Sequence, residues 1–236
     1  MVFVYYADDG PGREVPILRL ATVGCPKRRR CSIARPRIPL LSPDLIADAA
    51  LALVDSGQPF GVNALARSLG VTPSSLYNHV DGRDAIIELM RGRLGTTYLA
   101  ETPRGTWDEI VEATVRASRR MYAEHPFVVP LIVGKTITDP LVIASYDNLA
   151  TALLGAGFPD DEVVMVIAIL DSFAIGFGLD LASPDDIWRP ETPTTSLGRL
   201  LAVAPKGAER SDQVFETGLE LLLDALRLRL GRLELD

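Results

Sequence analysis

The stretch that decides the fold is FGVNALARSLGVTPSSLYNHVDGRDAIIEL, residues 60–89. Residues 62–69 are predicted to form a short helix, because their apolar side chains recur on one helical face. Gly70 follows this helix, where a sharp turn needs a residue that tolerates positive φ. A second helix is expected to begin with Thr72 as N-cap and Pro73 as its first residue.

The second helix has a dense row of hydrogen-bonding side chains that are expected to be exposed or half exposed. These are Ser74, Ser75, Tyr77, Asn78 and His79. Two helices joined by a glycine turn, with a polar second helix, form the shape that enters a DNA major groove. An ordinary helical hairpin with a solvated face fits the same pattern, because two helices and a turn are common.

Four short motifs carry a resemblance: Leu-Ala at 65–66, Leu-Gly-Val at 69–71, Leu-Tyr-Asn-His-Val at 76–80, and Arg83. In this spacing they resemble the DNA-binding region of the tetracycline-repressor (TetR) family. The resemblance implies a three-helix DNA-binding domain at residues 35–85, in which Tyr77 and Arg83 would hold phosphates. The residues expected to contact DNA within this stretch are Asn63, Thr72, Ser74, Ser75, Tyr77, Asn78, His79 and Arg83.

Charge is distributed unevenly along the chain. The net charge of −7 would normally argue against a nucleic-acid binder. Residues 24–42, however, contain no acid and six basic residues, so the rest of the chain carries −13 (−7 minus +6). These six are Lys27, Arg28, Arg29, Arg30, Arg35 and Arg37. If DNA is the partner, this basic arm must supply much of the phosphate attraction, with Arg35 and Arg37 nearest the first helix. A solvated charge run is the other reading.

The N-terminal region is expected to add little to the core. Residues 1–34 lack a persistent period and are predicted to be a mobile extension that ends in the basic arm. No signal peptide is evident, so a cytoplasmic location is expected.

Cys25 and Cys31 have no histidine or further cysteine beside them, which argues against zinc and favours a reduced pair. No metal or other cofactor is expected.

The remainder reads as a helical bundle, so the chain is predicted to be all-α, with 47% apolar and 6% aromatic residues. The apolar run at 163–179 fits either a buried bundle helix or a membrane span, and the aspartates that interrupt and bound it favour the bundle. The last helix is expected to be capped by Ser211, and it has apolar residues most of the way round. The expected helices are 42–57, 62–69, 72–80, 82–94, 106–124, 127–134, 139–157, 159–181, 197–203 and 211–231.

The resemblance covers about residues 35–230 and narrows to the tetracycline-repressor branch in the C-terminal half. Glu-Thr-Pro-Thr-Thr at 191–195 and Phe-Glu-Thr-Gly-Leu-Glu-Leu at 215–221 match that branch. It implies a ligand-binding and dimerisation domain at 86–236, with helices at 160–181 and 211–231 forming a four-helix dimer interface. A two-fold dimer would match a palindromic operator.

One departure from the tetracycline repressor concerns the ligand. Ile132 falls where that protein uses a histidine to hold drug-bound magnesium, and isoleucine has no lone pair for a metal. The pocket is therefore expected to take a neutral or weakly polar small molecule rather than magnesium-tetracycline. Asp171 could bind a cationic or hydroxylated ligand, or it could be an ordinary hydrogen-bonded core residue. The expected ligand-binding residues are Thr96, Thr114, Ser118, Met121, Tyr122, Ile132, Asp171 and Ser172.

The sequence disfavours an enzymatic function. It contains only two histidines, and no phosphate-binding loop, metal cluster or catalytic-triad spacing is visible in it. The sequence predicts a homodimeric, ligand-responsive transcriptional repressor with a double-stranded DNA operator, a small-molecule effector and no membrane partner. The alternative is a helical adaptor that has lost DNA binding, given the acidic DNA-binding domain.

Overall fold

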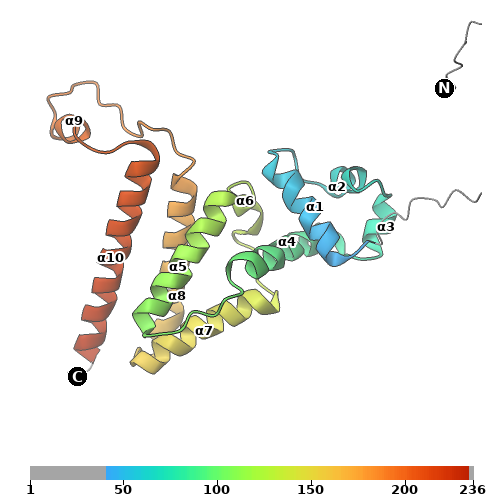
Figure 1. Cartoon of the computed structure of the whole chain (residues 1–236), viewed down its shortest axis with the longest axis horizontal. Helices are drawn as coiled ribbons and strands as arrows, with labels where there is room; N and C mark the ends of the chain where they lie inside the picture. Colours follow the sequence, from blue (N-terminus) through green and yellow to red (C-terminus); the bar gives the residue numbers. More distant parts are fainter. Residues whose placement is uncertain (1–40, 234–236) are drawn as a thin grey trace, which may run out of the picture. The chain divides into compact units, whose positions relative to one another are not determined.

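The computed structural model describes residues 41–233, and within them all regular structure is helical (Figure 1). The all-α prediction is therefore confirmed. The predicted mobile extension, the basic arm with Arg35 and Arg37, and the two cysteines lie outside the described residues.

The first three helices form the head of the molecule: α1 (Pro43–Asp55), α2 (Val62–Ser68) and α3 (Pro73–Tyr77). Two of the expected caps are present. Ser42 Oγ accepts from the N–H of Leu45 at 3.2 Å at the start of α1. Thr72 Oγ1 accepts from the N–H of Ser75 at 3.2 Å at the start of α3. The head closes on a small core whose fully buried side chains are Ile46, Ala50, Leu65 and Leu76.

Helix α4 (Gly82–Tyr98) runs from the head into the bundle and packs on both α1 and α7 (Pro140–Ala156). Two glycines allow the close approach to α7. A Cβ at Gly92 would lie 2.2 Å from an Asp139 carboxylate oxygen, and one at Gly95 would lie 2.7 Å from a Val142 methyl carbon. Because Asp139 also caps α7, through the N–H groups of Leu141 and Val142, the crossing of α4 fixes the start of α7.

The bundle is built around α5 (Trp107–Glu124), which packs against α8 (Asp160–Asp180), with the short α6 (Val129–Ile132) after it. Helix α5 begins where the capping box predicts, and the Glu109 carboxylate accepts from the N–H of Thr106 at 2.8 Å. The backbones of α5 and α8 come close at Gly178, where a Cβ would lie 2.5 Å from the Cβ of Tyr122.

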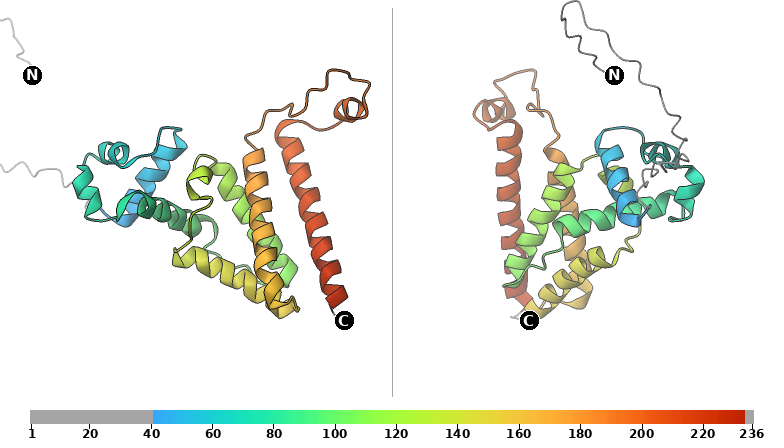
Figure 2. Two further views of the ribbon diagram at one scale, coloured as in Figure 1. Left: turned by 180° about the vertical axis from the view of Figure 1, so that it is seen from behind. Right: turned by 45° about the vertical axis from the view of Figure 1, so that its right-hand side comes forward.

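The last two helices are α9 (Ser196–Leu201) and α10 (Gly207–Leu233). Helix α10 lies beside α8 in every view of the ribbon (Figures 1 and 2). The prediction that Ser211 caps this helix is wrong, because α10 begins four residues earlier, at Gly207, whose φ is +56°. Ser211 is buried inside the helix, since its short side chain allows close packing there.

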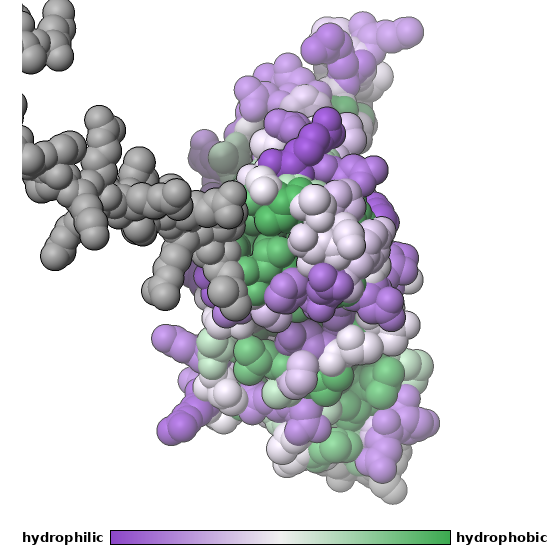
Figure 3. All heavy atoms as spheres, turned by 90° about the vertical axis from the view of Figure 1, so that its right-hand side faces the viewer, coloured by the Kyte–Doolittle hydropathy of each residue, from purple (hydrophilic) through white to green (hydrophobic). Residues whose placement is uncertain are grey.

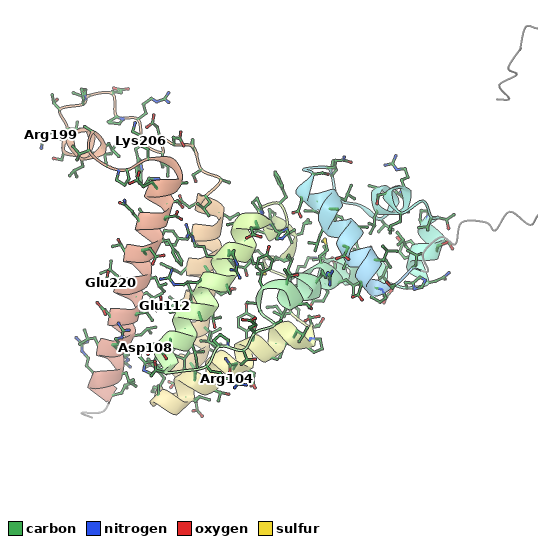
Figure 4. All side chains as sticks on the ribbon, in the orientation of Figure 1. Arg104, Asp108, Glu112, Arg199, Lys206 and Glu220 are labelled. Carbon is green, nitrogen blue, oxygen red and sulfur yellow. The ribbon has the colours of Figure 1, made fainter. Side chains whose placement is uncertain are left out.

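Ion pairs join α10 to α5 along the bundle. Figure 4 labels Asp108 and Glu112 on α5 and Glu220 on α10. Asp108 pairs with Arg227 at 2.7 Å, Arg116 pairs with Glu216 at 2.6 Å, and the latter pair holds the pKa of the Glu216 carboxyl below its usual range. Only four of the 27 residues of α10 are buried, namely Ser211, Phe215, Leu219 and Leu223.

Helices α8 and α10 each present an apolar face to solvent. On α8, Val164, Met165 and Ile169 are more than half exposed, and on α10, Leu221 and Leu228 are as well. The expected buried helix at 159–181 is thus buried on one face only. Within residues 41–233, α8 is the single helix that is long and apolar enough to cross a membrane. The core helix of a soluble protein can have the same length and composition.

Candidate DNA-binding face and effector cavity

The turn between α2 and α3 has the predicted geometry. Gly70 has φ of +66°, a conformation that side-chain-bearing residues rarely adopt. The N–H of Val71 donates to the carbonyl of Ala66 at 3.0 Å, which closes the turn. Leu76 and Val80 point inward and are buried, so the opposite side of α3 is free to contact a partner.

The polar residues predicted to contact DNA share the exposed surface of this unit. Tyr77 is 55% exposed, and Arg83 places its guanidinium 5.2 Å from the centre of the Phe60 ring. Helix α3 ends at Tyr77, so Asn78 and His79 lie in the turn that follows it. Exposed residues at this surface are Asn63, Thr72, Ser74, Tyr77, Asn78, His79 and Arg83, with Ser75 half-buried.

The electrostatics of the described residues are unfavourable for a polyanion. Residues 41–233 contain 16 basic and 26 acidic side chains, a net charge of −10. Seen from the side of α2 and α3, hydrophilic residues cover much of the surface, with apolar patches between them (Figure 3). The described residues therefore supply no net positive charge that would attract a polyanion.

Two adjacent cavities lie between α4, α5 and α7. The inner cavity has a volume of about 40 Å³, and the outer cavity, of about 310 Å³, lies at the end of α4; the two share Leu99, Thr114 and Ser145. Five of the predicted ligand-binding residues line the inner cavity, namely Thr114, Ser118, Met121, Tyr122 and Ile132. The fold brings these five residues together around one cavity, and their role in ligand binding stays a prediction.

Asp171 stands behind the inner cavity and joins three helices. Its carboxylate accepts a hydrogen bond from the Tyr122 hydroxyl at 3.3 Å and another from the Tyr146 hydroxyl. Burial raises the pKa of the Asp171 carboxyl, although these two hydrogen bonds and the charge of Arg91 act in the opposite direction. Burial, followed by the Asp171 charge, also raises the pKa of both tyrosines. The two phenols thus stay neutral and can offer oxygen lone pairs to a ligand.

Thr96 and Ser172 do not line either cavity. Both side chains are exposed, and each hydroxyl donates to a carbonyl of its own helix, Thr96 to Gly92 at 3.0 Å and Ser172 to Ala168 at 2.8 Å.

Sequence reasoning missed Arg91, which lines the inner cavity and is buried. Its Nη2 donates to the carbonyl of Ile132 at 2.9 Å, and its Nε lies 3.1 Å from a carboxylate oxygen of Glu88. A signal was present, because Arg91 shares a helical face with the buried Ile87 and Leu94. A charged residue on an apolar face indicates a buried polar contact.

His125, which follows α5, links the bundle to the head. Its Nδ1 lies 2.9 Å from an Asp55 carboxylate oxygen at the end of α1, and its Nε2 lies 3.1 Å from the Tyr98 hydroxyl at the end of α4. Burial and the hydrogen bond to Glu124 raise the pKa of Tyr98 to about 12. Helices α1, α4 and α5 are thus connected through one imidazole.

A helix–turn–helix with an exposed polar second helix, joined by one helix to a bundle with an internal cavity, defines a ligand-binding class of transcriptional regulator. The chain belongs to the tetracycline-repressor family, because the family model described as "Tetracyclin repressor-like, C-terminal domain" matches residues 99–230.

Sequence comparison finds relatives among transcriptional regulators, and solved structures share the fold. The repressor DrrR1 of Streptomyces coeruleorubidus is 24% identical over 80% of this chain and 78% of its own. An HTH-type transcriptional regulator of Saccharopolyspora erythraea is 27% identical over 64% of each chain. Apo ActR of Streptomyces coelicolor has a TM-score of 0.68 at 23% identity, over 82% of this chain and 98% of ActR. ActR in complex with actinorhodin has a TM-score of 0.64 at 25% identity, over 79% of this chain and 95% of ActR.

Proposed function

We propose that the protein is a ligand-responsive transcriptional repressor that binds a double-stranded DNA operator. The observation that carries this proposal is the exposed polar row on and after α3, on a turn whose geometry suits major-groove entry. Tyr77 and Arg83 hold phosphates, while Ser74, Ser75 and Asn78 face base edges. The named repressor DrrR1 and the ligand complexes of ActR support the same role.

The proposed domain division follows these roles. Residues 35–85 bind DNA, and residues 86–236 bind the effector and dimerise, with residues 1–34 as a basic extension. Because residues 41–233 carry a net charge of −10, the basic residues before them, including Arg35 and Arg37, supply phosphate attraction.

The repressor acts as a homodimer through the exposed apolar faces of α8 and α10. Val164, Met165 and Leu221 would become buried when these two helices meet their copies in a four-helix interface. Two recognition helices related by a two-fold axis then fit a palindromic operator. This assembly covers the apolar side of α8 without a membrane, which agrees with a cytoplasmic protein.

The effector binds in these adjacent cavities and acts on α4. Arg91 belongs to the wall of the inner cavity and also holds the end of α6, so a ligand that disturbs this contact moves α4 and with it the head. Coupling between two sites is typically about 1–3 kcal/mol. The effector is not magnesium-tetracycline, because Ile132 offers the cavity no metal ligand and residues 41–233 contain no cluster of metal-binding side chains.

The test is a DNA-binding titration at several salt concentrations, with the duplex upstream of the protein's own gene. Tyr77→Ala and Arg83→Ala should each weaken binding by about tenfold or more, while Arg104→Ala, with the same loss of charge as Arg83→Ala, should not. Arg104 is exposed and lies before α5, away from α3 (Figure 4). Absence of binding by a folded protein at low salt would favour the alternative, a helical adaptor without DNA binding.

A further inference from the structure

The outer cavity has a distinct composition. It is lined by the end of α4 and the segment after it, by α5 and by α7, and its lining includes Arg120, Asn148 and Glu101. It adjoins the inner cavity, with which it shares Leu99, Thr114 and Ser145. Beyond these residues the lining of the inner cavity is mostly apolar, with Arg91 as its one charged residue.

Arg120 is an exposed cation at this outer end. Its two neighbours on α5 are neutralised, because Arg116 pairs with Glu216 and Arg119 pairs with Asp212. No ion pair joins Arg120 to any residue within 41–233, and its guanidinium instead lies 5.7 Å from the centre of the Tyr98 ring. A ring face attracts the cation but does not cancel its charge.

Asn148 adds a donor that has no acceptor. Its side-chain nitrogen is buried and makes no hydrogen bond to any of the described residues. A buried amide N–H without a partner is unfavourable, and a ligand oxygen would remove this cost. The amide belongs to α7 and the guanidinium to α5, so donors lie on two walls of the outer cavity.

We propose that the outer cavity binds the carboxylate end of an effector whose apolar body extends toward the inner cavity. A carboxylate accepts from a guanidinium and from an amide N–H at once, with shorter and stronger hydrogen bonds than a neutral oxygen makes. Glu101 and Arg120 are both exposed at the rim, so solvent weakens the repulsion by Glu101 as well as the attraction by Arg120. This inference rests on the proposed function only in calling the ligand an effector.

The experiment compares 2-naphthoic acid with 2-naphthamide, which have the same aromatic body, by calorimetric titration of the full chain. The acid should bind at least tenfold more tightly than the amide. Arg120→Met and Asn148→Leu should each remove most of this preference, because each should weaken binding of the acid more than binding of the amide. Arg104→Met is the matched control, because it removes the same charge from an exposed residue outside the cavity. Circular dichroism confirms that each variant is folded.

Equal binding of acid and amide, no binding of the acid, or an unchanged preference in Arg120→Met would overturn the proposal. The operator titration is run on the same variants without either compound. Acid-selective binding by a protein that fails to bind DNA would support this inference and reject the repressor function. Operator binding without acid selectivity would support the repressor function and reject this inference.

Discussion

Arg91 on α4 donates a hydrogen bond of 2.9 Å from Nη2 to the carbonyl oxygen of Ile132 at the end of α6. The same nitrogen lies 3.4 Å from the carbonyl of Lys135, and Glu88 accepts from the N–H groups of Thr138 and Asp139 at 2.6 and 2.7 Å. One turn of α4 thus holds the whole segment between α6 and α7. Any displacement of that segment is transmitted to α4, the helix that continues into the head.

Arg91→Met should lower the free energy of unfolding by about 1–3 kcal/mol, because it leaves buried carbonyl oxygens without a donor. The matched control is Arg93→Met on the same helix, whose partner Asp48 is about half exposed, so the loss there should stay below about 1 kcal/mol. Urea denaturation measures both. Equal losses would mean that the Ile132 contact adds no stability.

Two helical glycines should respond oppositely to alanine. At Gly92 the new Cβ would lie 2.2 Å from the Asp139 carboxylate, so Gly92→Ala should disturb the cap of α7 and lower the melting temperature. At Gly155, also within a helix, nothing lies within 4 Å, so Gly155→Ala should raise stability by about 0.5–1 kcal/mol. Thermal unfolding of the two variants beside the wild type checks the sign of each effect.

Asp171→Asn should gain stability relative to the wild type as the pH rises. Burial raises the pKa of Asp171 above 3.8, so the folded protein binds this proton more tightly than the unfolded chain. The associated stability is present below pH 3.8 and is lost as the pH rises through the folded pKa. Asparagine does not titrate. The free energy of unfolding of Asp171→Asn should therefore rise relative to that of the wild type from pH 4 toward neutrality.

Glu216→Gln provides a control of opposite sign, since Arg116 lowers the pKa of Glu216 below 4.5. The stability that this carboxylate contributes is present above pH 4.5 and lost as the pH falls. The free energy of unfolding of the variant should therefore fall relative to that of the wild type as the pH rises from 4. Urea titrations at four pH values between 4 and 7.5 separate the cases. A pH-independent difference for Asp171→Asn would contradict the assigned shift.

Met165→Glu and Leu221→Glu should each convert the proposed dimer into a monomer, because each places a charge on a face that becomes buried on association. Ile143→Glu on α7 is the matched control, since it changes a half-exposed apolar residue outside α8 and α10 in the same way. Light scattering after size exclusion gives the mass. A dimeric Leu221→Glu variant would point to a different interface.

Local chemistry explains how much the sequence predicted. The turn at Gly70, the caps at Ser42 and Thr72 and the start of α5 each depend on residues within a few positions of one another, and all four were located correctly. The start of α10 was not, because a serine with cap chemistry also fits inside a helix when a neighbouring helix packs on it.

The cavities show the other limit of sequence reasoning. Thr114 and Ser118 were assigned by resemblance, whereas Arg120 meets Asn148 only when α5 and α7 pack side by side. No local spacing encodes that meeting. His125 likewise stands alone in the sequence, yet it contacts Asp55, 70 residues away.

Because few residues of α10 are buried within one chain, the folding of this helix depends on the concentration of the protein. With four buried residues among 27, the helix gains much of its burial in the proposed dimer from the second subunit. Ordering of α10 and association of the chains then form a single equilibrium that depends on protein concentration. Dilution in the cell would therefore reduce the folded population as well as operator occupancy, and the protein's own expression level would become one of the signals that set repression.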